Sequence, residues 1–569
     1  MTGGPFWPLA PLLCLLVLAT TALPAQYAPP LRGELLVTGT FGELRTDHYH
    51  AGLDFRGRTG TPVYAVARGF VSRVKVQAGG FGQAVYVDHP DGFRSVYAHL
   101  ESFAPELHDT VRAAQYAAES FAVDLAFDSL AFPVAVGQRL GAVGNRGHSF
   151  GPHLHFEVRE IAGDVPVNPL AFGLAVSDRR APQLRNLRLY ELDGRGRSLR
   201  EHELALREVR PGDYSAGRDT LRVGTARLGV GLKAYDRQDG LPNWNGIYAA
   251  ELLADSALVT RFACDRIPFA ATEYLNALTD YRDWLANRSW YYKFWAGSRE
   301  QLFLMEPPPA DHGVLTLSPH RPRELRLRAR DYAGNASETA LTVVYDPDLA
   351  PAAPPEPHQY FLPAGEESLI DNGDLRLHLP AGSLYADLYF RYARLPDRSA
   401  GRHSDTHQLH DPLTPLHGRA RLALRPYARP PDSLLRQFFV GHCAADGHTI
   451  SHGGAWTADG RLATDIRAFG DYAIFRDTLA PTIAIRSFPT DLRRAAGFSL
   501  LVHDDVAGGP LRYRATVDGE WVLLEYDAKN DRLDHTFGGG RIGPGNHRFQ
   551  LTVTDARGNT ATFRRDFRR

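Results

Sequence analysis

The feature that most constrains the fold of this chain is a pair of histidines two positions apart, His153 and His155. They lie in an alternating segment typical of a β-strand, so both imidazoles are expected on one face. A second polar pair, His50 and Asp54, occurs far earlier in the chain. Neutral imidazoles and a carboxylate are the three protein ligands that a catalytic zinc ion takes, leaving a fourth position for water. We therefore predict a fold that brings the two remote segments together around one metal ion.

Length and charge bound the class of protein. A chain of 569 residues indicates several domains. The formal net charge of -1 gives no reason to expect nucleic acid or an anionic membrane surface as a partner. A short apolar run at 11–19, followed by small residues before Gln26, predicts that residues 1–25 are an export signal. The run is too short to span a bilayer, so we expect an exported chain with no transmembrane segment in its mature form.

Cys264 and Cys443 are the cysteines expected to remain after cleavage of the signal. Their separation does not suggest a disulfide framework, and neither has the paired spacing of a structural zinc site. We predict that both are buried small residues in two separate domains.

The predicted fold class is mainly β throughout. Residues 26–176 consist of short alternating segments separated by glycine-rich turns, which predicts a β domain. An insertion at 104–133 differs, because it has helical spacing at 106–120 followed by strand-like alternation. The insertion fits a wall of a substrate groove and a simple packing element equally well.

Beyond residue 178 the sequence repeats weakly. Asp178-Arg179-Arg180-Ala181-Pro182 recurs as Asp477-Thr478-Leu479-Ala480-Pro481, and Asp331-Tyr332-Ala333-Gly334-Asn335 recurs as Asp555-Ala556-Arg557-Gly558-Asn559. The second pair of motifs follows alternating strands and suits hairpin turns. We predict β-sandwich domains at 178–346 and 478–569, separated by a proline-rich linker at 347–357 and a further β domain at 358–476.

Aromatic residues beside turns in these later domains are ambiguous. Trp244, Trp290 and Trp521 could face sugar or protein, but we predict that they are core aromatics of the sandwiches.

The motifs of the first domain follow one another in a characteristic order. The ordered segments are His50-Ala51-Gly52-Leu53-Asp54, Gly60-Thr61-Pro62, Gly80-Phe81-Gly82, Val96-Tyr97-Ala98-His99-Leu100 and Gly151-Pro152-His153-Leu154-His155-Phe156-Glu157. This set resembles the lysostaphin-type metallopeptidases (peptidase family 23, the LytM-like domain), which are zinc endopeptidases that cut peptide bridges of bacterial peptidoglycan. The resemblance covers about residues 34–172.

The resemblance implies an architecture and a location. It implies an N-terminal LytM-like β-domain of the duplicated hybrid motif type, here followed by several Ig-like β-sandwich domains. The arrangement is similar to exported members in Bacteroidetes and related Gram-negative bacteria. We therefore expect the protein in the periplasm, in the cell envelope or outside the cell.

The resemblance also implies roles for five residues. His50, Asp54 and His155 match the ligands of one zinc ion per chain. His153 matches the histidine that activates water, and His99 matches a second catalytic histidine expected to hydrogen-bond the oxyanion. The remaining predictions concern residues near these motifs: His48, His89 and His148 as surface or hydrogen-bonding residues, and Gly52 and Gly151 as backbone requirements.

Three functions remain open from the sequence. The first is an exported zinc metalloendopeptidase that hydrolyses peptide cross-links of bacterial peptidoglycan. The alternative is a non-catalytic envelope scaffold or an activator of another cell-wall hydrolase, motivated by a tail more than twice as long as the first domain. A third keeps the metal but cleaves glycine-rich proteins. In each case the C-terminal β domains are candidates for contacting envelope protein or glycan.

Overall fold

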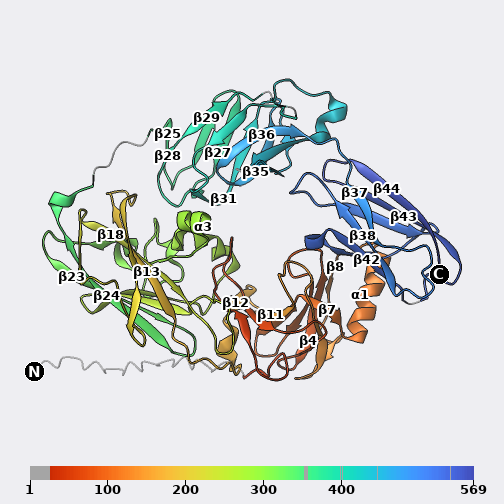
Figure 1. Ribbon diagram of the computed structural model, residues 1–569, viewed down its shortest axis with the longest axis horizontal. Coiled ribbons are helices and arrows are strands. Elements are labelled where there is room, and N and C mark those ends of the chain that lie inside the picture. The colour runs from red at the N-terminus through yellow and green to blue at the C-terminus, as the bar shows by residue number, and fades with distance from the viewer. Residues whose placement is uncertain (1–25, 352–356, 398, 400, 445, 539) are drawn as a thin grey trace, which may run out of the picture.

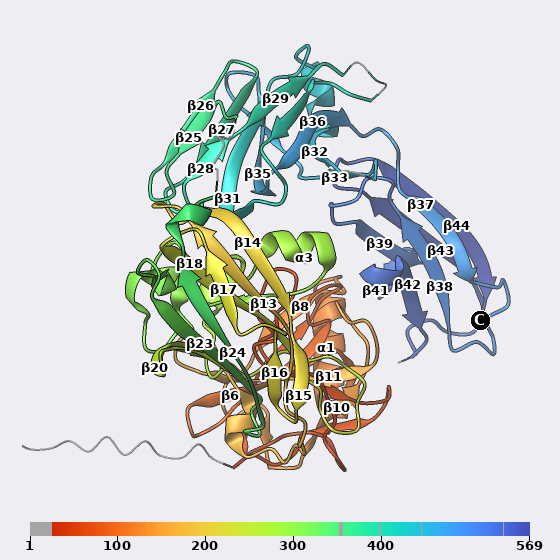
Figure 2. The same cartoon turned by 60° about the vertical axis from the view of Figure 1, so that its left-hand side comes forward.

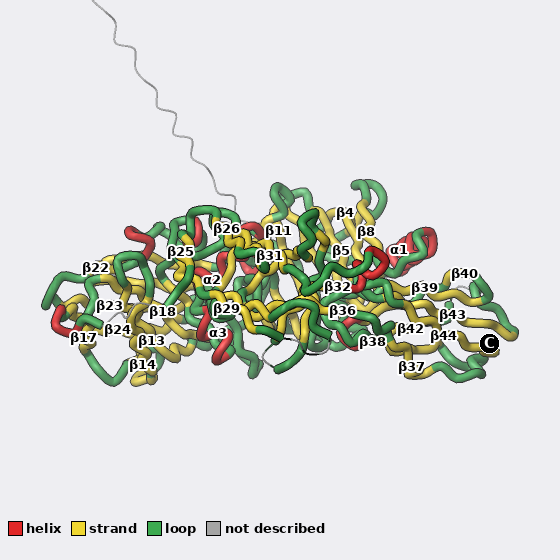
Figure 3. The backbone as a smooth tube through the Cα atoms, turned by 90° about the horizontal axis from the view of Figure 1, so that it is seen from above, coloured by secondary structure: helices red, strands yellow, loops and turns green. Residues whose placement is uncertain are grey.

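The computed structural model describes residues 26–351, 357–397, 399, 401–444, 446–538 and 540–569. The predicted export signal and five residues of the predicted linker lie outside the described residues. Figure 1 shows mainly β units arranged around a ring, and Figure 3 shows the same ring from above as a flat assembly. We call them the N-terminal unit (26–176), the second unit (178–346), the third unit (358–476) and the C-terminal unit (478–569).

Two sheets build the N-terminal unit. The larger sheet has the strand order β1-β2-β11-β6-β5-β4-β8, with β12 beside β11 and β9 beside β4. The smaller sheet has the order β3-β10-β7. The strands are β1 (Val37–Gly39), β2 (Leu53–Arg56), β3 (Pro62–Tyr64), β4 (Gly69–Val76), β5 (Gln83–Asp88), β6 (Phe93–Ala98), β7 (Leu100–Phe103), β8 (Val123–Ala126), β9 (Pro133–Val134), β10 (Arg139–Val143), β11 (His153–Glu160) and β12 (Val165–Val167).

Pairing between β2 and β11 positions the polar motifs. The antiparallel register sets His155 opposite Asp54 on one side and opposite Ala98 of β6 on the other. Leu154 and Phe156 alternate with the histidines and are fully buried in the core. The apolar residues therefore take the core face of β11, which leaves His153 and His155 together on the opposite face, as predicted.

The insertion contains one helix and one strand. Helix α1 (Pro105–Ala117) begins at a proline and buries Leu107 and Val111, and β8 then adds to the sheet beside β4. The predicted helix followed by a strand is confirmed, although the helix ends three residues before the predicted limit at residue 120.

The described residues of the second unit form two sheets. The first contains β13 (Gln183–Leu192), β14 (Ser198–Ala205), β18 (Arg227–Tyr235), β21 (Tyr292–Lys293) and β22 (Leu315–Thr316). The second contains β15 (Arg207–Arg210), β16 (Asp213–Ser215), β17 (Thr220–Val223), β19 (Ala249–Ala254), β20 (Ala257–Ala263), β23 (Pro322–Arg330) and β24 (Ala336–Tyr345). Two short helices, α2 (Leu275–Leu278) and α3 (Tyr281–Asn287), were not predicted. The carboxylate of Asp280 caps α3 by accepting from the backbone N–H of Asp283, a local signal that the β-rich surroundings mask.

The N-terminal and second units share one hydrophobic core. A single cluster of buried side chains runs from Tyr27 to Val343. Cys264 is buried within it, and a β-carbon added at Gly42 would come within 2.4 Å of its sulfur, so the two chain segments touch. Cys264 is thus buried as predicted. Cys443 of the third unit is only half-buried, contrary to prediction: it lies at the end of a strand (Phe438–Cys443), where its sulfur contacts the guanidinium of Arg402.

The third and C-terminal units have separate cores. Strands of the third unit are β25 (Tyr360–Leu362), β26 (Ser368–Asp371), β27 (Leu375–Leu379), β28 (Leu388–Phe390), β29 (Tyr392–Leu395), β30 (Thr406–Leu409), β31 (Pro415–Leu424), β32 (Phe438–Cys443), β33 (Thr449–Ser451), β34 (Ala455–Trp456), β35 (Leu462–Ala468) and β36 (Gly470–Arg476). Those of the C-terminal unit are β37 (Thr482–Ser487), β38 (Gly497–His503), β39 (Arg512–Val517), β40 (Glu520–Trp521), β41 (Glu525–Asp527), β42 (Arg532–Thr536), β43 (Asn546–Thr554) and β44 (Thr560–Arg568).

The C-terminal unit returns to the N-terminal unit and packs on the insertion, as Figures 1 and 2 show. The ring of Trp521 meets Tyr116 of α1 edge-on at 5.0 Å, and Arg541 lies 3.7 Å from the centre of the same tyrosine ring. Arg514 forms an ion pair with Glu119. The insertion therefore packs within its own unit and also docks the C-terminal unit, which agrees with its interpretation as a packing element. Docking between units was not foreseen.

The predictions for the three tryptophans have different outcomes. Trp290 is buried, as expected of a core aromatic. Trp521 packs across the unit boundary on Tyr116, and Trp244 is 39% exposed beneath the guanidinium of Arg237, so the core prediction is wrong for both. Trp521 lies just after a turn and Trp244 lies in a loop, and both rings contact a neighbouring segment instead of the core of their unit. Among the described helices, none has the length and apolarity needed to cross a membrane.

Candidate metal centre

Three side chains from two remote segments converge above the large sheet. His50 Nε2 lies 3.1 Å from His155 Nδ1, and Asp54 Oδ1 lies 3.0 Å from His155 Nδ1 and 3.2 Å from His50 Nε2. Ligand atoms at about 2.0–2.1 Å from a tetrahedral ion are separated by about 3.3–3.4 Å. The three atoms therefore need only a small outward shift to hold one divalent ion, and their chemistry is the one such an ion requires.

The outer atoms of all three side chains are fixed by neighbours. The Thr40 carbonyl accepts from His50 Nδ1 at 2.8 Å, and Glu157 accepts from His155 Nε2 at 2.8 Å. Arg45 donates to Asp54 Oδ2 at 3.0 Å. Because each ring keeps a proton on its outer nitrogen, the inner nitrogen is left to bind a metal.

His153 and His99 complete the cluster. His153 Nε2 lies 3.4 Å from Asp54 Oδ1, while its Nδ1 donates to the carbonyl of Gly151 at 2.8 Å. His99 Nδ1 lies 2.7 Å from the carbonyl of Arg146, and its ring centre is 4.9 Å from that of His153. The structure thus brings all five residues named from the sequence into one place.

The hydrogen bond of His99 to the Arg146 carbonyl bears on which of its ring nitrogens carries a proton. Burial, with the nearby His155 and His153, lowers its pKa to about 3, so the ring is neutral near pH 7. The proton of a neutral ring is needed at Nδ1 for the bond to the Arg146 carbonyl. Nε2 of the neutral ring then carries the lone pair.

The hydrogen bonds of His155 favour its protonated form. Burial opposes charge on His155, but hydrogen bonds to Asp54 and Glu157 outweigh it and raise the pKa of His155 to about 9. The pKa of Asp54 lies well below its ordinary value despite burial, because His50, His153 and His155 surround the carboxylate. A proton at His155 Nδ1 accordingly occupies the place in which a divalent ion would sit, and the two compete.

The two glycines expected to matter have different outcomes. A β-carbon at Gly52 would lie 2.4 Å from the carbonyl oxygen of Phe156, so the loop bearing His50 and Asp54 can approach β11 only with glycine there. A β-carbon at Gly151 would meet no atom within 4 Å, so the prediction of a backbone requirement is wrong for Gly151. The close backbone approach is therefore at Gly52, in the segment that carries His50.

Among the neighbouring histidines, His89 is buried and bonded to the Arg68 carbonyl and Ser95, His48 contacts Asp47, and His148 is exposed. Sequence reasoning gave no role to Glu157, yet it is fully buried and holds His155. Its position two residues after His155, on the same strand face, was an available signal. Thr40 and Arg146 orient His50 and His99 through their main-chain carbonyls. The identity of their side chains therefore could not reveal these contacts.

Comparisons with known proteins agree with this geometry. Residues 48–126 match the model of Peptidase family M23, and residues 359–477 match a Zu5-like domain. The DD-carboxypeptidase/endopeptidase Mpg of Neisseria meningitidis is 36% identical over 131 residues, which are 23% of this chain and 24% of that protein. The cell division protein DipM of Caulobacter vibrioides is 32% identical over 134 residues, 24% of this chain and 18% of that protein.

Among solved structures, the catalytic domain of the prophage-encoded M23 protein EnpA from Enterococcus faecalis is 26% identical. The match covers 26% of this chain and 98% of that domain, with a TM-score of 0.20. The shared region spans about a quarter or less of the length of the curated relatives named above.

Metal binding should depend on pH through His155. Because its pKa of about 9 must be overcome, zinc binding at pH 7 should release about one proton, and affinity should rise about tenfold per pH unit between pH 6 and 8. Calorimetric titrations in buffers of different ionisation enthalpy measure the proton release. A release near zero at pH 7 would contradict the arrangement.

Glu157 should contribute to metal affinity without touching the ion. The substitution Glu157→Gln weakens the partner of His155 Nε2 and should lower zinc affinity by roughly 10- to 100-fold. Competition with a chromogenic chelator measures the change. Glu160→Gln, at the exposed end of the same strand, is the matched control and should bind zinc like the parent.

Proposed function

We propose that this chain, whose residues 48–126 belong to peptidase family M23, is an exported zinc metalloendopeptidase that hydrolyses peptide cross-links of bacterial peptidoglycan. The observation that carries the proposal is the convergence of His50, Asp54 and His155 within 3.2 Å of one another, with His153 and His99 beside them. The relative named as a DD-carboxypeptidase/endopeptidase supports the substrate class.

The chemistry divides between the ion and the histidines. A zinc ion held by His50, Asp54 and His155 would supply Lewis-acid activation of a water molecule and of the scissile carbonyl. His153, whose Nδ1 proton is held by the Gly151 carbonyl, presents the lone pair of Nε2 toward Asp54. We assign His153 the role of accepting the proton of the attacking water and passing it to the leaving amine, because an imidazole exchanges protons in both directions near neutral pH.

His99 has a related role on the other side of the cluster. Its Nε2 is an acceptor while the ring is neutral, and it becomes a donor only after it takes a proton. We propose that neutral His99 acts through this lone pair, accepting a hydrogen bond from the attacking water and orienting it. Its left-handed backbone, with φ at 58°, places the ring over the site at some cost in strain.

The C-terminal unit braces the loop that orients both histidines. Lys529 donates to the carbonyls of Asn145 and Ser149, the latter at 2.9 Å, and Glu525 pairs with Arg146 at 3.1 Å. The Arg146 carbonyl is the acceptor for His99. Glu525 therefore contacts Arg146, and the carbonyl of Arg146 holds His99. The C-terminal unit is linked in this way to a proposed catalytic residue.

Removing either histidine should abolish turnover but leave the metal in place. His153→Ala and His99→Ala should each lower the rate of peptide release from purified sacculi by about 10²- to 10⁴-fold, with zinc content unchanged. His148→Ala is the control, since His148 is exposed and lies in the same loop region. Full activity in His153→Ala would exclude our assignment.

The contacts of Lys529 with the loop should affect the rate of catalysis rather than the metal content. Lys529→Ala frees the 145–149 loop and should lower kcat on the order of tenfold, since small displacements of catalytic groups are costly. Arg541→Ala is the control, because Arg541 contacts Tyr116 in the same interface but not the loop. Equal losses in both variants would point to undocking of the whole unit instead.

A scaffold or activator of another hydrolase is the alternative. A scaffold has no need of metal, so a chain that binds no zinc and releases no peptides, yet stimulates a second hydrolase, would favour it. Cleavage of glycine-rich protein with no release from sacculi would instead keep the metal chemistry and change the substrate.

A further inference from the structure

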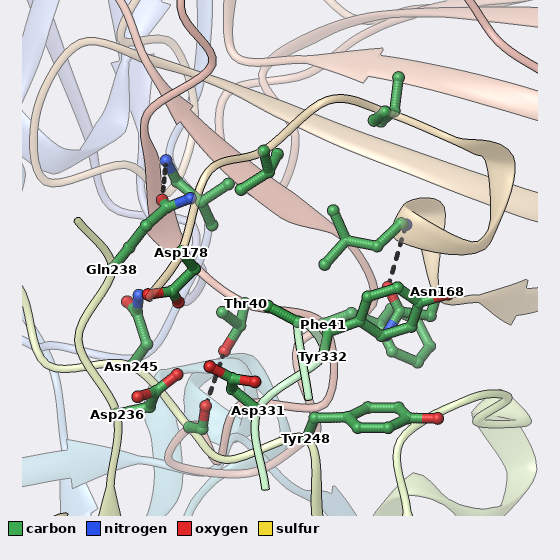
Figure 4. Close-up of a pocket in the computed structure, with 16 residues that line it drawn as sticks. Thr40, Phe41, Asn168, Asp178, Asp236, Gln238, Asn245, Tyr248, Asp331 and Tyr332 are labelled. Atoms are coloured by element: carbon green, nitrogen blue, oxygen red, sulfur yellow. Dashed lines mark hydrogen bonds between the residues drawn. The ribbon is translucent and has the colours of Figure 1, made fainter. Parts of the chain in front are cut away.

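A second cluster of acidic side chains lies away from the histidines, where the second unit meets the N-terminal unit. Asp178, Asp236 and Asp331 each place a carboxylate oxygen within 4.8 Å of the other two. Twice the usual Ca²⁺–oxygen distance of about 2.4 Å is about 4.8 Å, so one ion can reach all three. Asp236 and Asp331 are each only 4% exposed. Figure 4 shows the three carboxylates around one small cavity of about 100 Å³.

An amide oxygen without a partner points to a ligand in this cavity. Asn245 is 2% exposed, lines the same cavity, and its Oδ1 accepts no hydrogen bond from any described residue. Figure 4 shows its amide directed at Asp178. Asp236 Oδ1 is likewise buried without a partner among the described residues. Leaving two such oxygens unsatisfied costs free energy unless something absent from the chain itself binds them.

The negative charge of the cluster is not balanced by the protein. Within the described part of the chain, no Lys, Arg or His forms an ion pair with Asp178, Asp236 or Asp331. The nearby Arg179 and Arg180 pair instead with Asp239. Buried carboxylates are paired or coordinate a metal, and pairing is missing here.

We propose that Asp178, Asp236, Asp331 and Asn245 bind a calcium ion. All four offer oxygen and none offers nitrogen or sulfur, which favours a hard cation over zinc. A buried cage of protein oxygens favours Ca²⁺ over Mg²⁺, which gives up its water reluctantly.

The same arrangement is built a second time from the repeated motifs. Asp477, Asp504 and Asp555 also lie within 4.8 Å of one another in the C-terminal unit. Asn335 Nδ2 joins Asp331 to the Asp178 carbonyl at 2.6 and 3.3 Å, and Asn559 Nδ2 joins Asp555 to the Asp477 carbonyl at 2.8 and 3.5 Å. The repeated motifs therefore do more than form hairpin turns: they bring a carboxylate from the start of the unit against one from a later turn.

The cavity lies between the N-terminal and second units, so an ion bound there would have a structural role. Thr40 and Phe41 of the N-terminal unit line the same cavity, and Thr40 Oγ1 contacts the carbonyl of Gly246 at 3.3 Å. The main-chain carbonyl of Thr40 is the group that orients His50. A calcium ion here would stiffen the contact between the two units directly behind one of the proposed zinc ligands.

Calcium titration of chelator-treated chain from residue 26 onward tests the proposal. An Asp504→Asn background weakens the second acidic cluster, so that the response reports on the first. Calcium chloride should raise the unfolding midpoint in a saturable way. Adding Asp236→Asn should weaken calcium affinity by calorimetry at least about tenfold and remove the rise. Its calcium-free midpoint should not fall, because the substitution relieves repulsion.

Asp239→Asn, an acidic neighbour outside the cluster, is the matched control and should respond like the background. Asn245→Ala provides a second variant that should weaken calcium binding. The double variant His50→Ala, His155→Ala should keep the calcium response, which separates this site from the proposed peptidase. An absent response, a response unchanged by Asp236→Asn, or one lost in the histidine double variant would overturn the proposal.

Discussion

Everything at the proposed active site depends on the antiparallel pairing of β2 with β11. Its register sets Asp54 opposite His155, while Leu53, Phe55, Leu154 and Phe156 fill the core on the other face. A shift by one residue would turn the histidines into the core and expose the leucines, so burial of the apolar face fixes the position of the ligands. The positions of the proposed ligands therefore follow from the packing of the apolar face of the sheet.

How far the sequence could predict this site follows from the kind of group involved. Side chains with distinctive chemistry in a fixed order, such as His50, Asp54 and His155, could be placed before any coordinates. Main-chain acceptors could not, because the carbonyls of Thr40 and Arg146 belong to residues whose side chains say nothing about them. The position of the proton on His99 depends on one of these carbonyls, so the tautomer of this ring could not be predicted from the sequence.

At the level of the fold, periodicity gave the β-rich class and the helix of the insertion, since both are local signals. It did not give the docking of Trp521 on Tyr116, which depends on contacts between segments far apart in sequence. The short helices α2 and α3 were also missed, because the local capping signal at Asp280 lies in β-rich surroundings. The repeated Asp motifs were visible as turns. The sequence did not show that these motifs bring three carboxylates together, because that depends on how the strands between them fold.

The hydrophobic core shared by the first two units bears on how this chain could have been assembled. The region matched by the family model ends at residue 126, yet the apolar cluster around it continues to Val343. A gene fragment encoding only the matched stretch would lack the rest of this cluster and would expose apolar surface to water. The shared core makes residues 26–346 one packing unit, so a recombination event that keeps this core intact must move them together.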